Sequence, residues 1–221
     1  MNSATDIHEA IASLTLGIVC NPIPQSIVDI GCGTGSLLSM FKAKGVNEVL
    51  GVDGHWVAED QLRIAKHEFM RHEFMRHDFE AAALKLPKRY CLAISTEVAE
   101  HLSSEHADAF VQALVDASDI ILFSAAVPGQ GGTNHVNEQW PSYWIEKFAA
   151  HGYMMFDCIR PALWSFSGNE WWYKQNLFLF CKEGKTSRLS IPNVSFPYDV
   201  IHPQAWQMRN YQMQQLMLNK K

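Results

Sequence analysis

The sequence predicts an α/β fold built on a mostly parallel sheet, and three observations support this fold class. A short apolar run, residues 27–30, leads directly into a turn with Gly31, Gly33 and Gly35. Apolar residues then recur at helical spacing up to Lys44. Further along, apolar strand-like runs alternate with helical patterns, as expected of parallel strands joined by crossover helices.

Length and composition indicate one ordinary globular domain. The chain has 221 residues, of which 48% are hydrophobic, and this is enough for a full α/β core. Its net charge of −5 argues against a nucleic-acid partner, although a local basic groove stays open. The five cysteines are scattered without a C-x-x-C pair, so reduced thiols are expected. With no leader-like start and no membrane-length apolar run, we expect a soluble cytoplasmic protein without a membrane partner.

The chain divides into three parts. Residues 1–25 hold a short amphipathic helical segment, which two prolines end before the first strand. Residues 26–182 carry the alternating strands and helices. Residues 183–221 form a polar, proline-broken tail that finishes in a Met/Gln-rich stretch, and residues 204–218 of this stretch predict a helix.

Strands are expected throughout the middle part, each from an apolar run. The expected strands are residues 27–30, Glu48–Asp53, a segment ahead of Asp78, and residues 88–95, 120–127, 153–159 and 176–181. Residues 103–105 give a capping signal for a helix through Val115, and a second helix is expected from Ser142 to His151. The last two strands are joined by a long aromatic segment without a clear helix, which permits an antiparallel pair.

Two acids accompany the glycine turn. Asp29 lies inside the first strand, and Asp53 ends the second strand, where a ribose diol would be held by paired hydrogen bonds. The spacing G-x-G-x-G differs from the dinucleotide fingerprint G-x-G-x-x-G. Residues 28–35, Val-Asp-Ile-Gly-Cys-Gly-Thr-Gly, resemble the first motif of the class I S-adenosylmethionine-dependent methyltransferases. This resemblance implies a single-domain Rossmann-like fold, whose seven-stranded, mostly parallel sheet has one antiparallel strand, and S-adenosyl-L-methionine as the cofactor.

The same resemblance implies which residues bind the methyl donor. Asp78 and Phe79 follow the expected third strand, where the family places an acid and an apolar residue against the adenine. The donor-site residues carried over in this way are Asp29, Gly31, Cys32, Gly33, Gly35, Asp53, Gly54, Asp78, Phe79 and Thr96.

A verbatim repeat precedes Asp78. Residues 67–71, His-Glu-Phe-Met-Arg, recur as residues 72–76, and a degenerate third copy begins at His77. A His-rich tract could bind a metal, but a period of five matches neither a helix nor a strand, so the histidines would not share one face. We therefore interpret the repeat as a local duplication.

The sharpest candidates on the acceptor side are Glu97, Glu100 and His101. At helical spacing they share one face at the start of the helix expected after the fourth strand. Two carboxylates and an imidazole suit Mg²⁺ or Mn²⁺. The block Glu-x-x-Glu-His resembles small-RNA 3′-terminal 2′-O-methyltransferases and ubiquinone-pathway O-methyltransferases, which are reported to bind metal through it. In many small-molecule methyltransferases a similar block begins a helix without a known metal, so both interpretations stay open.

His135 is the second candidate, and it follows a glycine-rich loop. It could be a general base, a fourth metal ligand beside Glu97, Glu100 and His101, or a loop residue without a role. Aromatic residues of the long segment around 164–173 are expected to wall the acceptor pocket or to pack under a long loop.

These features predict a methyltransferase that uses S-adenosylmethionine, with Glu97, His101 and His135 as the candidate catalytic residues. The expected acceptor is a hydroxyl of a small molecule or glycan-like compound. One alternative is an RNA 2′-O-methyltransferase, which the negative net charge disfavours. Another is a non-catalytic module that keeps the cofactor pocket to bind a partner. The sequence carries no signal for an oligomeric state.

If the repeat is a duplication, deleting one five-residue copy should leave folding and donor binding nearly intact, because a shorter loop changes the chain entropy only slightly. Thermal unfolding and calorimetry with S-adenosylhomocysteine measure both properties. A deletion variant that is insoluble or no longer binds the cofactor would contradict the interpretation, and loss of metal binding would support the His-tract alternative.

Overall fold

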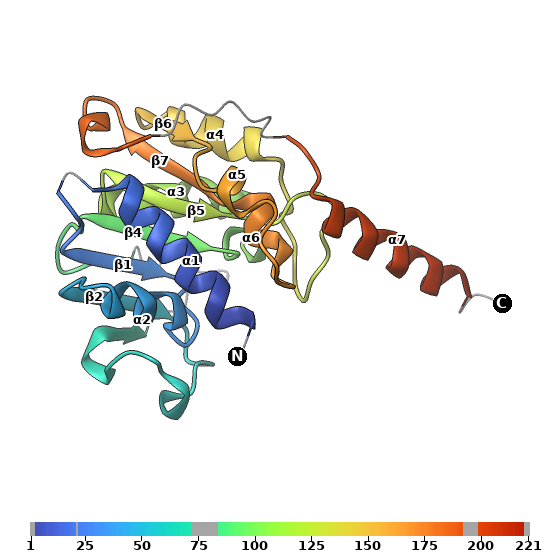
Figure 1. Cartoon of the computed structure of the whole chain (residues 1–221), viewed down its shortest axis with the longest axis horizontal. Helices are drawn as coiled ribbons and strands as arrows, with labels where there is room; N and C mark the ends of the chain where they lie inside the picture. Colours follow the sequence, from blue (N-terminus) through green and yellow to red (C-terminus); the bar gives the residue numbers. More distant parts are fainter. Residues whose placement is uncertain (1–2, 21, 72–83, 192–198, 219–221) are drawn as a thin grey trace.

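A seven-stranded sheet forms the centre of the computed structural model, which describes residues 3–20, 22–71, 84–191 and 199–218 (Figure 1). Its strand order is β3-β2-β1-β4-β5-β7-β6. The strands are β1 Ser26–Ile30, β2 Glu48–Asp53, β3 Phe69–Arg71, β4 Leu92–Thr96, β5 Ile120–Ser124, β6 Tyr153–Phe156 and β7 Phe178–Lys182. β7 runs antiparallel to both of its neighbours, and the other neighbouring pairs are parallel. The implied mostly parallel sheet with one antiparallel strand is thus confirmed.

Helices cover the sheet on both faces (Figure 1). They are α1 Ser3–Ile18, α2 Ser36–Ala43, α3 Ala107–Ala117, α4 Pro141–Ala149, α5 Arg160–Leu163, α6 Trp171–Asn176 and α7 Pro203–Leu218. Short 3₁₀ turns are η1 Glu59–Gln61, η2 Lys66–Glu68, η3 Ala99–His101, η4 Ser104–His106 and η5 Thr186–Arg188. In the described part of the chain, no helix combines the length and the apolar character needed to cross a membrane.

The central strands are buried on both faces, which explains their continuous apolar runs. Every residue of β1 and of β5 is buried. One core cluster joins the sheet to α3 and α4, and there Phe148 stacks on Phe180 with ring centroids 4.1 Å apart. The other joins it to α1 and α2 and includes Ile11, Ile27 and Phe41. The two cores hold the sheet rigidly and so fix the positions of the loops at its ends.

Several expected boundaries were wrong. Residues 88–91 precede β4 because Tyr90 makes only an isolated bridge, to Ser118. β5 and β6 end earlier than expected, and β7 begins two residues later because Asn176 still belongs to α6. The segment between β6 and β7 contains two short helices, α5 and α6, where no clear helix was expected.

The third strand lies within the repeat. β3 comprises Phe69–Arg71 of the first copy, and it pairs with β2 so that Arg71 lies opposite Asp53. Asp78 and Phe79 lie outside the described residues, so their assignment to the donor site stays a prediction.

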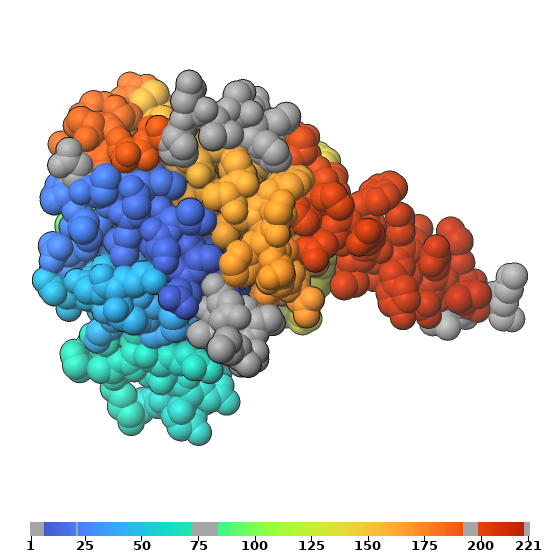
Figure 2. Space-filling view, in the orientation of Figure 1, coloured from blue at the N-terminus to red at the C-terminus, as the bar shows by residue number. Residues whose placement is uncertain are grey.

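The expected tail helix is present as α7, and it projects from the rest of the molecule (Figures 1 and 2). Its first residues contact α6, while large apolar side chains beyond them are exposed. The exposed set is Trp206, Met208, Tyr211, Met213, Leu216, Met217 and Leu218.

The glycine turn after β1 yields a prediction about stability. Gly31→Ala and Gly33→Ala each place a side chain at positive φ, which costs about 1–2 kcal/mol. Only at Gly31 would the new methyl group collide with a neighbour, because it would lie 2.2 Å from a methyl carbon of Val98. Overpacking of that kind costs about 1–3 kcal/mol more. Chemical denaturation should therefore give Gly31→Ala the lower free energy of unfolding, and equal losses in the two variants would contradict this packing.

Candidate functional site

The carboxyl ends of β1, β2 and β4 meet at one edge of the sheet, and the glycine turn lies there. Gly31, Gly33 and Gly35 have φ values of 87°, 53° and 77°, which favour glycine. Side chains at the first and third would strike Val98 and Ile64. A side chain at Gly33 would instead meet open space. The turn therefore packs against the protein at Gly31 and Gly35, and its backbone at Gly33 is left uncovered.

Asp53 fastens this turn to the end of β2. Its carboxylate accepts hydrogen bonds from the N–H of Gly33 at 2.6 Å and from the N–H of Gly54 at 2.7 Å. Burial raises the pKa of Asp53, and the two backbone hydrogen bonds oppose that rise. The predicted pairing of the glycine turn with an acid at the next strand tip is thus present in the structure.

Asp29 lies beneath the turn. Burial, and then the nearby Asp53 carboxylate, raise its pKa well above the usual range. Its Oδ1 is buried without a hydrogen-bond partner among the described residues. Burial likewise raises the pKa of the Cys32 thiol. An unpartnered buried carboxylate beside a glycine cradle fits a ligand that brings a positively charged group and hydroxyls.

Two residues meet at this edge: His8, which the sequence analysis missed, and Tyr173, one of the aromatic residues expected to wall the acceptor pocket or to pack under a long loop. His8 of α1 is in hydrogen-bond contact with the Ser36 hydroxyl and with the Tyr173 hydroxyl, each at 3.1 Å. Tyr173 belongs to α6, and burial raises its pKa, as does the negative charge of Glu97. Thr96, predicted from the family, ends β4 and hydrogen-bonds with Tyr173. Only folding brings His8 and Tyr173 together, since they are far apart in the sequence.

The second cluster begins directly after β4, but the helix expected there is absent. Glu97 adopts a left-handed backbone conformation with φ of 55°, and η3 is a single 3₁₀ turn. The backbone N–H of Glu97 donates to the Ser124 carbonyl at the end of β5. The expectation that Glu97, Glu100 and His101 share a helical face was therefore wrong, because this tertiary contact turns Glu97 aside.

Glu97 is held within the pocket by two amides. Its carboxylate accepts hydrogen bonds from Gln130 Nε2 at 2.8 Å and from Asn176 Nδ2 at 3.1 Å. Burial raises its pKa, and these hydrogen bonds oppose the rise. Neither amide was singled out from the sequence, because each comes from a segment remote from Glu97.

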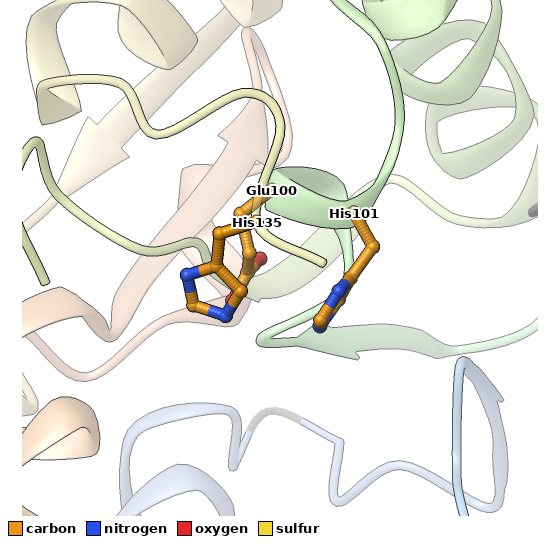
Figure 3. A group of neighbouring side chains, drawn as sticks. All are labelled: Glu100, His101 and His135. Atoms are coloured by element: carbon orange, nitrogen blue, oxygen red, sulfur yellow. The ribbon is translucent and has the colours of Figure 1, made fainter. Parts of the chain in front are cut away.

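Glu100, His101 and His135 come together as predicted. Each offers a ligand atom, and these three atoms lie within 4.8 Å of one another (Figure 3). Backbone hydrogen bonds hold these segments together, because the N–H groups of Val136 and Asn137 both donate to the Glu100 carbonyl. The loop that carries His135 is thus tied to η3.

Glu100 is the unusual member of this group. Its side chain is fully buried, and neither carboxylate oxygen has a regular hydrogen-bond partner among the described residues, although the backbone N–H groups of Glu100 and Ala126 lie close enough to lower its pKa. Burial, followed by the nearby charge of Glu97, raises the pKa of Glu100 to about 9. A buried carboxylate of this kind is stabilised either by a proton or by a cation.

Each histidine already uses one ring nitrogen. His101 Nδ1 lies 3.3 Å from the Asn134 carbonyl, and His135 Nδ1 lies 3.0 Å from the Glu138 carboxylate. Glu138 also accepts the N–H groups of Gly129 and Gly131 at 2.7 and 2.6 Å. Such contacts orient metal-ligating histidines and leave the other nitrogen for a ligand or a proton. The sequence analysis did not identify Glu138 as the partner of His135, although an acid three residues after a histidine can reach its ring.

A pocket of about 310 Å³ opens at this cluster. The residues that line it are Glu97, Glu100, His101, Gln130, Gly131, His135 and Trp172. All four predicted metal-site residues therefore face one pocket, together with one of the predicted aromatic residues. Such a set of carboxylates and imidazoles can hold a divalent cation or accept a proton.

Comparisons with known proteins agree with this arrangement. Residues 27–118 match the family model described as a methyltransferase domain. A comparison with curated protein sequences gives no significant match.

Solved structures share the fold at low sequence identity. An O-methyltransferase family protein from Burkholderia thailandensis superposes with a TM-score of 0.55 and 8% identity, over 80% of this chain and 57% of that protein. The methyltransferase domain of bacterial CtHen1-C gives a TM-score of 0.52 and 16% identity, over 81% and 97% of the two chains. Magnesium protoporphyrin IX methyltransferase from Synechocystis PCC 6803, with bound SAH, superposes with a TM-score of 0.55 and 14% identity. The superposition covers 81% of this chain and 84% of that protein. The chain thus spans little more than half of the Burkholderia protein.

The matched residues include the glycine turn, Asp53 and the Glu97–His101 block. Residues 27–118 therefore match a methyltransferase domain, and the chain has the fold of the superposed methyltransferases.

Proposed function

We propose that the protein transfers a methyl group from S-adenosylmethionine to a hydroxyl oxygen of a small-molecule or glycan-like acceptor, with the help of Mg²⁺ or Mn²⁺. One observation carries the metal part of this proposal. Among the described residues neither buried carboxylate oxygen of Glu100 has a regular hydrogen-bond partner, and each of the two histidines beside it has one ring nitrogen engaged. A divalent cation is the ligand that best satisfies such a group.

The donor side rests on Asp29, Gly33 and Asp53. The Asp53 carboxylate is placed to hold the ribose hydroxyls of the donor. The bare backbone of Gly33 lets the ligand approach closely, and the unpartnered Asp29 oxygen suits a positively charged amino group. These residues supply the hydrogen-bond acceptor oxygens and the bare backbone that a donor of this kind needs.

On the acceptor side, the proposed cation ligands are Glu100, His101 and His135. Glu97 completes the set, because a carboxylate that accepts two hydrogen bonds keeps lone pairs for a further ligand. A bound divalent cation lowers the pKa of a hydroxyl that it contacts. Without a cation, His135 is our choice of general base, since Glu138 holds its Nδ1 and fixes the orientation of the ring.

The charge of the protein supports a small acceptor over RNA. The net charge is −5, and Glu97 and Glu100 line the pocket itself. A nucleic-acid enzyme needs a basic surface that neutralises phosphates. We therefore propose a small hydroxyl compound as the partner of this site.

Donor binding is tested by calorimetry. We expect S-adenosylmethionine or S-adenosylhomocysteine to bind with micromolar affinity, on the order of −8 kcal/mol. Asp53→Ala should weaken binding by about 1.5–3 kcal/mol, because it removes hydrogen bonds to a charged group. Asp60→Ala is the control, since Asp60 is an exposed acid nearby. Folded protein that gives no binding heat with either ligand would rule out the donor assignment.

Metal binding is tested by electron paramagnetic resonance of added Mn²⁺. The wild type should bind the ion, and Glu100→Gln and His101→Ala should each weaken its affinity at least tenfold, because each removes a ligand. Donor affinity should not change in either variant. Glu105→Gln, which alters an exposed acid of η4, should bind Mn²⁺ normally.

The same hypothesis predicts that EDTA abolishes turnover while leaving donor binding intact. Activity that persists unchanged in excess EDTA would make the cluster structural and would favour His135 as the general base. His135→Ala should then remove activity and leave donor binding unchanged.

A further inference from the structure

A second pocket of about 170 Å³ adjoins the catalytic pocket. Its walls are the loop residues Val127–Gln130, then Trp171, Ile201, and three residues of α7, which are Ala205, Trp206 and Arg209. Gln130 lines both pockets. Of the neighbouring tryptophans of α6, Trp172 lines the first pocket, and Trp171 lines the second as well as a third that Tyr211 borders. Because the first two pockets share Gln130, they lie side by side between the Glu97–Glu100 cluster and the first turns of α7, and we treat them together as one groove.

The start of α7 is firmly placed beside this groove. The Gln204 Oε1 accepts a hydrogen bond from the buried Lys174 ammonium at 2.8 Å, and the backbone N–H of His202 donates to Gln175 Oε1. On the loop side, Arg209 Nε lies 3.9 Å from where a side chain on Gly129 would begin. These contacts make the first turns of α7 a fixed wall of the groove.

The chemical character of the groove changes along its length. The catalytic end presents the carboxylates of Glu97 and Glu100. The middle is aromatic, with Trp171 nearly buried and the Trp206 side chain 61% exposed. The α7 end presents the guanidinium of Arg209, for which no ion pair with another described residue is found. Arg209 is also the only charged residue of α7.

We propose that this groove binds the methyl acceptor as an aromatic compound with a hydroxyl at one end and an anionic group at the other. The proposal rests on the function proposed above, since the hydroxyl lies toward Glu100 and His135. The ring packs against Trp171 and Trp206, and Arg209 pairs with the carboxylate or similar anion. Arginine binds planar anions through paired hydrogen bonds, and indoles supply large apolar contact area.

Binding is measured without methyl transfer, so that failure of this proposal is separate from failure of the proposed function. The probes are 6-hydroxy-2-naphthoate and its uncharged analogue 6-hydroxy-2-naphthamide, titrated onto the full chain in EDTA with tryptophan fluorescence as the readout. The wild type should bind the naphthoate at least tenfold more tightly than the amide. Arg209→Gln should remove that difference, and Trp206→Ala should weaken both probes several-fold.

Two matched variants complete the experiment. Arg188→Gln removes a positive charge elsewhere and should keep the preference for the anion. Tyr211→Ala alters an aromatic residue of α7 that lines a different pocket, and it should bind both probes normally. Equal affinity of the wild type for the two probes would overturn the proposal, as would a preference that survives Arg209→Gln. Loss of binding in Tyr211→Ala but not in Trp206→Ala would place the acceptor on the wrong face of α7 and would also overturn it.

A separate measurement tests whether a second copy of the chain, and not the acceptor, covers the exposed Trp206 side chain. Sedimentation velocity should give the same mass for the wild type and Trp206→Ala over the concentrations used. A dimer that dissociates in Trp206→Ala would show that a second copy covers Trp206, and this would contradict the acceptor groove. If the naphthoate binds through Arg209 and is not methylated, the groove stands and the proposed function is the part that fails.

Discussion

The parallel pairing of β1 with β4, and of β4 with β5, is the constraint on which both halves of the site depend. Ile27 lies opposite Leu92, and Thr96 lies opposite Ser124. The Ser95 hydroxyl donates to the Ile30 carbonyl at 2.8 Å and ties the ends of β1 and β4 together. Because parallel strands end at the same edge, the glycine turn and Glu97 must emerge side by side. A shift in this register would separate the glycine turn from the Glu97–Glu100 cluster.

Burial of carboxylates is the main energetic cost at this edge. Asp29 and Glu100 are buried, Glu97 is partly buried, and all three have raised pKa values. Charged groups are costly to bury unless they are paired or hydrogen-bonded. The side-chain amides of Gln130 and Asn176 donate hydrogen bonds to the Glu97 carboxylate. Carboxylate oxygens of Asp29 and Glu100, in contrast, lack regular hydrogen-bond partners among the described residues. The protein therefore keeps buried acidic groups at the points where ligands are proposed. Neutral side chains of similar shape would make the fold more stable but would not bind a cation or a positively charged ligand group.

Much of this arrangement could be predicted from the sequence because it is local. The glycine turn, Asp53 and the approach of His135 to Glu100 and His101 follow from motifs at strand ends. The position of β3 could not be predicted, since two identical copies offer the same apolar pattern. The turn at Glu97 could not be predicted either, because a contact with Ser124 overrides the helical spacing. Gln130, Asn176 and His8 enter through long-range contacts, which no local pattern records.

The reversed direction of β7 places the segment between β6 and β7 at the edge of the sheet that carries the candidate site. Phe178, at the start of β7, lies opposite Phe123 near the end of β5. The residues just before β7 thus reach the same edge as the ends of the parallel strands, and α6 brings Trp172, Tyr173 and Asn176 to the site. A parallel β7 would carry α6 to the opposite edge. Changes between β6 and β7 can therefore remodel the proposed acceptor side while the glycine turn between β1 and β2 stays as it is. Under the proposed function, one scaffold could thus accommodate different acceptors without a change in its donor site.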